Sequence, residues 1–270
     1  MKIKLSQAVA FVALTIALYG CSCNQTTNQP EISKQHIEEN VREFVYPLPT
    51  AFEVTEMLNR IEAAYIQAIC NDQNVADNYL TETKRALNLG VYSADLCYAS
   101  TYNQQPTVRD YMNVISKLID QLDMTNAVDP ELPSKVEKNE NNKEELTRLI
   151  TDSFYDSYDY LNKNDRGPVS LLIVTGSWVE ALYITTHISE FTFDNKEMVK
   201  IVMSQKDPLI KLMELLEKYP GVESIDSIKA SLQPLYQIYT SIEEGGISET
   251  QTESIKNAVD GVRNSIVAFE

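Results

Sequence analysis

Apolar positions recur at helical spacing along most of the chain after Thr50. Within 50–69 they fall three or four residues apart, and Thr50 with Glu53 matches a helix capping box. No stretch of alternating apolar and polar residues is long enough to predict a strand. We therefore expect an all-α fold, a bundle of about eight helices within one domain at 35–270. The main predicted helices are 50–69, 75–102, 106–124, 143–162, 169–191, 195–219, 223–243 and 248–269.

Prolines and polar stretches predict where these helices bend or end. The helix at 195–219, capped by Asn195, should kink or break near Asp207-Pro208, because proline removes a backbone hydrogen bond inside a helix. For the same reason Pro234 should bend the helix at 223–243. The polar segment 125–142 contains two prolines and is expected to be a linker with at most one or two helical turns. A further short helix is expected at 35–44.

Two predicted helices share a local pattern that suggests an internal duplication. The stretches 86–96 and 172–182 each contain glycine, an aromatic residue and leucine at the same spacing. Glycine inside a helix costs about 1 kcal/mol relative to alanine, so Gly90 and Gly176 should serve a close crossing of two central helices. Coincidence between two leucine-rich helices explains the similarity equally well. If the duplication is real, the bundle has two pseudo-symmetric three-helix sets and a C-terminal helix pair, at 50–124, 143–219 and 222–269.

The N-terminus has the layout of a secretory signal. Lys2 and Lys4 precede an apolar run from 5 to 18, which Gly20 and Cys21 end. The run is too short to span a bilayer, because a spanning helix needs about 20 apolar residues.

Leu18-Tyr19-Gly20-Cys21 resembles the lipobox of bacterial lipoproteins, although Tyr19 stands where a small residue is usual. The resemblance implies cleavage before Cys21, which would then carry diacylglycerol and an N-acyl chain. Residues 1–20 would be the signal peptide and 21–34 a flexible polar tether to the domain. An ordinary cysteine after a conventional cleavage site is the alternative.

The chain as a whole resembles the uncharacterised all-helical lipoproteins of Gram-negative cell envelopes. That resemblance implies attachment to a membrane through the lipid on Cys21 and carries no catalytic residue over. Ser22 after the lipidated cysteine implies sorting to the outer membrane. The lack of an acidic run there favours the periplasmic face over surface display.

The charge balance limits the partners. The chain has 23 Lys and Arg against 39 Asp and Glu, a net charge of −16, and removal of Lys2 and Lys4 with the signal gives about −18. Such a surface repels phosphate groups, so nucleic acid and anionic lipid headgroups are poor partners.

Signatures of catalysis and cofactor binding are missing from the sequence. His36 and His187 are the two histidines, so a two-histidine metal motif on one helix cannot form. We expect no catalytic set, no metal and no cofactor, and acidic pairs such as Glu243-Glu244 are expected to be solvated. Cys70 and Cys97 should lie at opposite ends of a helical hairpin, as core thiols and not as a disulfide.

The best remaining candidate site lies on the helix at 169–191. Glu180, Tyr183 and His187 are spaced so that they share one face with Gly176. With Trp178 they could bind a small polar ligand, or act as acid and base. The alternative is that Glu180 and His187 form a structural hydrogen-bond pair or point to solvent, and a structural role is likewise the alternative for Asp95. A tyrosine cluster could stack on a ligand or pack as a half-buried helix face, at Tyr155, Tyr158 and Tyr160.

Three functions follow from these observations, in order of preference. The first is a non-catalytic binding or scaffold lipoprotein that engages another envelope component. The second is a small-ligand-binding lipoprotein for uptake, with a cleft between the helical sets lined by Trp178, Tyr183 and tyrosines. The third is a hydrolase, which needs Glu180 and His187 within hydrogen-bond reach of each other.

Overall fold

A computed structural model of the protein describes residues 51–139, 142–188, 191–243 and 246–269. The expected signal peptide, the tether, Cys21 and the short helix at 35–44 lie outside these ranges. Within them every regular element is helical, which confirms the all-α fold class. The α-helices are α2 (Ala51–Arg60), α3 (Glu82–Thr101), α4 (Gln105–Gln121), α5 (Leu132–Lys138), α6 (Lys143–Lys163), α7 (Gly167–His187), α8 (Lys196–Met203), α9 (Lys206–Leu216), α10 (Glu223–Thr240) and α11 (Glu249–Val267).

The described residues contain ten α-helices where about eight were expected. The polar linker forms α5, and the predicted helix at 195–219 is two helices, α8 and α9. The break falls at Ser204-Gln205 and not at Asp207-Pro208. Pro208 lies in the first turn of α9, where its missing N–H has no intrahelical partner to lose. Asn195 caps α8 as expected, since its side-chain oxygen accepts from the N–H of Met198 at 3.2 Å.

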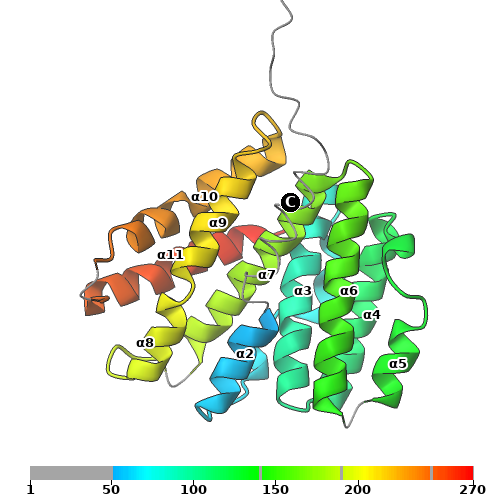
Figure 1. Ribbon diagram of the computed structural model, residues 1–270, viewed down its shortest axis with the longest axis horizontal. Helices are drawn as coiled ribbons and strands as arrows, with labels where there is room; N and C mark the ends of the chain where they lie inside the picture. The colour runs from blue at the N-terminus through cyan, green and yellow to red at the C-terminus, as the bar shows by residue number, and fades with distance from the viewer. Residues whose placement is uncertain (1–50, 140–141, 189–190, 244–245, 270) are drawn as a thin grey trace, which may run out of the picture.

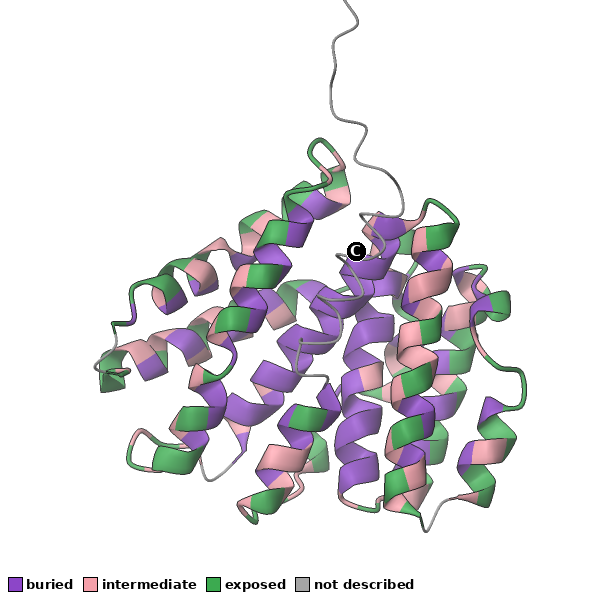
Figure 2. Ribbon diagram, in the orientation of Figure 1, coloured by how far each residue is buried: buried purple, intermediate pink, exposed green. Residues whose placement is uncertain are grey.

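Helices α3 and α7 form the centre of the molecule and are buried along nearly their whole length (Figures 1 and 2). Their close crossing depends on Gly90 and Gly176. A Cβ on Gly90 would overlap the carbonyl oxygen of Ile173 and lie 2.6 Å from the nitrogen of Ser177. A Cβ on Gly176 would in the same way overlap the backbone carbonyl of Leu87. The predicted close crossing is confirmed, while the proposed duplication stays a prediction.

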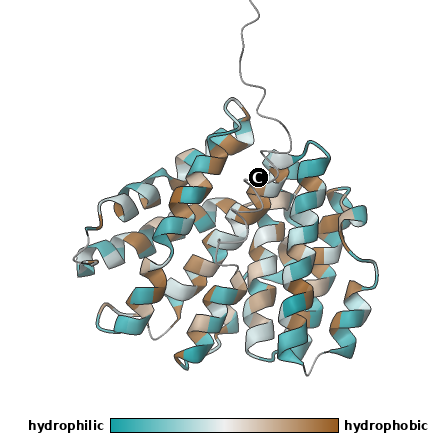
Figure 3. Cartoon of the chain, viewed as in Figure 1, coloured by the Kyte–Doolittle hydropathy of each residue, from teal (hydrophilic) through white to brown (hydrophobic). Residues whose placement is uncertain are grey.

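The surrounding helices pack around this central pair. Helices α2, α4 and α6 lie against α3, whereas α8, α9 and α11 lie against α7 (Figure 1). The outer helices show alternating hydrophilic and hydrophobic bands, as expected for helices that bury one face (Figure 3). Helix α7 is long and apolar enough to cross a membrane, but 94% of its apolar window is buried inside the protein. Its hydropathy is therefore that of a core helix.

Residues 61–81 form an irregular segment with two short 3-10 helices, η1 (Gln67–Ile69) and η2 (Gln73–Asn78). Two long helices were expected here, so α2 and α3 are shorter than predicted. Buried tyrosines fix the segment to α3 instead. The hydroxyl of Tyr98 donates to the carbonyl of Ala64 at 2.9 Å, and that of Tyr92 donates to the carbonyl of Asp72 at 2.8 Å. These tertiary hydrogen bonds replace the helical ones and satisfy buried carbonyls.

Helix α11 closes the bundle against the start of α3. Nζ of Lys84 donates to the carbonyls of Ser265 at 2.8 Å and Ala268 at 3.0 Å, at the C-terminus of α11. Nδ2 of Asn88, which is buried, donates to the carbonyl of Ile266 at 3.0 Å. These donors satisfy carbonyls that a helix end leaves without partners, and the positive charge suits the negative end of the helix dipole.

Candidate functional site

Glu180 is buried on α7 and is held by Arg263 of α11. Nε and Nη2 of Arg263 donate to the two carboxylate oxygens of Glu180 at 3.0 Å and 3.1 Å. The side chain of Glu180 has no exposed area, and that of Arg263 is 11% exposed. A two-pronged contact of this kind is the strong form of carboxylate–guanidinium pairing. Both oxygens of Glu180 are therefore engaged by the protein itself.

His187 lies two turns further along α7 and pairs with a different residue of α11. Its Nε2 lies 2.9 Å from Oδ1 of Asp260, and its Nδ1 lies 2.9 Å from the carbonyl oxygen of Tyr183. The imidazole stacks on the Tyr183 ring with centroids 4.0 Å apart, and the Arg263 guanidinium lies 4.5 Å from the same ring centroid. Cation–π contact and stacking hold this part of the helix interface together.

These contacts place Glu180, Tyr183 and His187 together at the interface of α7 with α11. The hydrogen bonds of the described residues include none between Glu180 and His187, since each binds its own partner on α11. Glu180 and His187 therefore do not form a structural pair with each other, because each is held by a residue of α11 instead.

Asp95 of α3 completes the polar interior beside Glu180. It is fully buried, and the backbone N–H of Asn71 donates to its Oδ2 at 3.0 Å. Burial, and then the negative charge of Glu180, raise the pKa of Asp95 well above its usual range. Burial also raises the pKa of Glu180, but Arg263 opposes that shift. Asp95 is therefore the carboxyl more readily protonated, whereas Arg263 favours the ionised form of Glu180.

The proton on Asp95 explains an oxygen that is otherwise unsatisfied. Oδ1 of Asp95 is buried and accepts no hydrogen bond from the residues that the structure describes. A hydroxyl at that oxygen can donate to the neighbouring Glu180 carboxylate. We refer to Asp95, Glu180, His187, Asp260 and Arg263 as the ionic cluster.

The remaining residues of the predicted site lie outside the ionic cluster. Trp178 is buried, and its Nε1 has no hydrogen-bond partner among the described residues. Gly176 lies at the helix crossing, where the backbone of Leu87 takes the space that a side chain would need. Of the tyrosine cluster, Tyr158 is buried, while Tyr155 and Tyr160 are partly buried and pack against the core.

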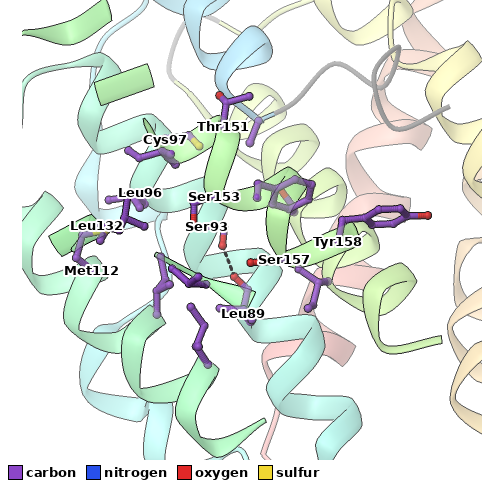
Figure 4. A pocket seen from close by; sticks show the side chains of 18 of the residues that line it. Leu89, Ser93, Leu96, Cys97, Met112, Leu132, Thr151, Ser153, Ser157 and Tyr158 are labelled. Atoms are coloured by element: carbon purple, nitrogen blue, oxygen red, sulfur yellow. Dashed lines mark hydrogen bonds between the residues drawn. The ribbon is translucent and has the colours of Figure 1, made fainter. Parts of the chain in front are cut away.

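A separate cavity of about 110 Å³ lies between the two predicted helical sets (Figure 4). Helices α2, α3 and α4 line it from the first set, and α6 and the first half of α7 from the second. This is the location expected for a ligand cleft, but neither Trp178 nor Tyr183 is among the lining residues. The apolar lining includes Leu89, Leu96, Cys97, Met112, Ile115, Ile119, Leu132, Ile150, Phe154, Leu161, Ile173 and Val174.

The polar side chains that line the cavity are mainly those of serine and threonine, together with Tyr158 and the thiol of Cys97, and no charged residue or histidine is among its lining residues. Ser93 and Ser116 donate to carbonyls of their own helices, at 2.6 Å and 2.8 Å. By contrast, the side-chain hydroxyls of Ser153, Ser157 and Ser177 make no hydrogen bond with any residue that the structure describes. Figure 4 shows Ser93, Ser153 and Ser157 gathered at the cavity, with the Ser93 bond drawn. We refer to this space as the serine cavity.

An open hollow between α2 and α6 is lined in part by charged side chains, among which Glu56, Arg148 and Asp152 form ion pairs. Lys143 lies 2.9 Å from Glu56, and Arg148 contacts both Glu145 and Asp152 at 2.6 Å and 2.7 Å. The described residues contain no group of three His, Cys, Asp or Glu side chains placed to hold a metal ion. Cys70 and Cys97 are free thiols.

Sequence reasoning missed Arg263 and the unpaired serines. Arg263 follows the apolar positions Val259 and Val262 on α11, so a cation beside an apolar stripe was the available signal. Ser153 and Ser157 are four residues apart on α6 and thus share a face, but serine at such positions is common on solvated helices. Only the position of α6 against α3 and α4 makes these residues part of a cavity.

Comparisons of the chain with family models, with curated proteins and with solved structures found no match.

Proposed function

We propose that this chain is a lipid-anchored protein of the bacterial cell envelope that acts as a non-catalytic binding or scaffold protein. In this proposal acyl chains on Cys21 hold the domain at the outer membrane, on its periplasmic face. The observation that carries the non-catalytic part is the pairing of Glu180 with Arg263 in a site without exposed carboxylate surface.

The same pairing argues against the hydrolase hypothesis. A general acid or base must reach the substrate within hydrogen-bond distance. Both oxygens of Glu180 accept from Arg263, and Nε2 of His187 lies beside Asp260. A substrate would have to separate these pairs, which leaves a buried charge without compensation and is costly.

The anchoring proposal is tested by metabolic labelling with an alkyne-bearing fatty acid in the native bacterium or a related Gram-negative host. The wild-type chain should incorporate the label and sediment with outer membranes, and Cys21→Ser should lose both properties. Cys23→Ser is the matched control, because it removes a thiol two residues away in the expected tether, and it should keep the label. Equal labelling of Cys21→Ser and wild type would overturn the proposal. Protease resistance in intact cells, lost on outer-membrane permeabilisation, would support the periplasmic face.

A second candidate function is ligand binding for uptake, and the serine cavity favours it. The cavity combines a mainly apolar lining with hydroxyls that have no partner among the described residues. Ligand sites in proteins are typically concave and mostly apolar, with a few polar groups that fix orientation. The direct test is binding of a small molecule to the purified protein, designed below.

A further inference from the structure

We propose that the serine cavity binds an uncharged, mainly apolar molecule of the size of phenol that carries one hydroxyl group. This inference rests on the proposed role as a binding protein and names the chemistry of its ligand. Three properties of the cavity support it: its volume, its unpaired hydroxyls and its lack of charge.

The volume limits the ligand to a small molecule. An engineered apolar cavity of about 150 Å³ in another protein stays dry and binds benzene. The serine cavity measures about 110 Å³, which is smaller, so the part of a ligand that it holds is no larger than a single ring or a short alkyl chain. The lining supplies matching apolar surface from Leu96, Met112 and Ile115.

The unpaired hydroxyls determine the polar end of the ligand. Serines inside helices commonly either bond to the carbonyl one turn back, as Ser93 and Ser116 do here, or leave their hydroxyl free for another partner. Ser153 and Ser157 of α6 and Ser177 of α7 make no such bond and line the cavity. A hydroxyl can both donate and accept, so one ligand hydroxyl can satisfy two of these serines.

The lack of charged lining residues excludes ionised ligands. A carboxylate or ammonium in such a site would lose its hydration without gaining a counter-charge, which is strongly unfavourable. The route of entry lies beside α6, because Ser153, Phe154 and Ser157 are partly exposed while the lining residues of α7 are buried. The ligand therefore reaches the cavity between α6 and the α4–α5 side.

The experiment uses the full lipoprotein in lipid nanodiscs and ligand-detected fluorine NMR with three probes. The probes are 4-fluorophenol, fluorobenzene and 4-fluorobenzoate, with empty nanodiscs as the blank for partition into lipid. We expect 4-fluorophenol to bind and unlabelled phenol to displace it. Fluorobenzene should bind about tenfold more weakly, because it lacks the hydroxyl, and 4-fluorobenzoate should not bind. Equal binding of 4-fluorophenol and fluorobenzene would overturn the hydroxyl assignment.

Two variants locate the site. Ser157→Ala should weaken 4-fluorophenol by about tenfold and leave fluorobenzene unchanged. Ser116→Ala is the matched control, because that hydroxyl lines the same cavity but is already bonded to Met112, and it should leave both affinities unchanged. Leu96→Phe fills the cavity and should abolish binding of both probes. Retained binding in a folded Leu96→Phe protein would overturn the location, and if that variant fails to fold, the two serine variants decide.

Failure of this inference is distinct from failure of the proposed function. Loss of acylation in the wild type would refute the anchor whatever the probes do. Absence of probe binding in a chain that is acylated at Cys21 would refute the ligand assignment and leave the scaffold function.

Discussion

The two halves of α7 are built into different kinds of interior. The first half, from Ser170 to Ser177, lines the serine cavity, where the surroundings are apolar and hydroxyls lack partners. The second half, from Glu180 to His187, packs on α11 through the ionic cluster, where charged side chains have partners at hydrogen-bond distance. One helix therefore carries both a hollow region and a tightly paired region.

The two regions differ in what they contribute to stability. Buried charges are retained when they are paired, and removing one partner is costly, so the ionic cluster fixes the position of α11. An unfilled apolar space forgoes dispersion contacts, so the serine cavity contributes less to folding than a filled core would.

The largest loss of stability is expected at the crossing of α3 and α7, which supports both regions of α7. Gly90→Ala should destabilise the fold by more than about 4 kcal/mol, because its Cβ would meet backbone atoms of Ile173 and Ser177 that cannot move independently of α7. Chemical denaturation followed by circular dichroism measures the effect. Gly261→Ala is the control, since its Cβ meets nothing within 4 Å in the middle of α11, and it should be stabilising by about 0.5–1 kcal/mol. A similar stability of the two variants would contradict the close crossing.

The next largest effect is expected in the ionic cluster. Arg263→Met should cost about 3–5 kcal/mol in free energy of unfolding, because it leaves the Glu180 carboxylate buried without its counter-charge. The double variant Glu180→Gln with Arg263→Met should recover part of this loss, because the uncompensated charge is removed. A cost below about 1 kcal/mol would mean that the pair behaves as an exposed surface ion pair.

The sequence predicts those parts of the fold that depend on interactions between residues close together in the chain. The two central helices and their glycine crossing were predictable, because helical spacing and the penalty for glycine are local signals. The irregular segment 61–81 was not, because hydrogen bonds from Tyr92 and Tyr98 override its helical spacing. The break between α8 and α9 was predicted at Asp207-Pro208, a few residues after its observed position. The reason is local, because proline is tolerated in a first helical turn.

The candidate site depends even more on contacts between residues far apart in the chain. The shared face of Glu180, Tyr183 and His187 follows from helical geometry. Their partners Asp260 and Arg263 lie about 80 residues away in the chain, and no local pattern joins them. The serine cavity depends on how far α6 stands from α3, which is a property of packing volume and not of residue spacing.

Raising the pH should weaken the ionic cluster through Asp95. Its pKa is raised in the folded protein, so the folded state binds a proton more tightly than the unfolded chain does. The resulting stabilisation is complete below the unfolded pKa of about 3.9 and is lost as the pH rises through the folded pKa. Asp95→Asn keeps a neutral donor in place and should be more stable than the wild type at high pH, with the difference shrinking toward acid. Urea titrations of both proteins at several pH values measure this difference, and a difference that grows toward acid would contradict the assignment of the proton.

The smallest effect on stability is expected from Ser157→Ala, although this variant should weaken binding of 4-fluorophenol about tenfold. Ser157→Ala should change the free energy of unfolding of the ligand-free protein by no more than about 0.5 kcal/mol, because its hydroxyl has no partner among the described residues and alanine favours the helix. Tyr92→Phe removes a hydroxyl too, but one that donates to the carbonyl of Asp72, so it should cost about 0.5–1.5 kcal/mol. Both values come from thermal or chemical unfolding. If Ser157→Ala cost as much as Tyr92→Phe, that hydroxyl would be part of the folded structure and unavailable to a ligand, and the two halves of α7 would no longer differ.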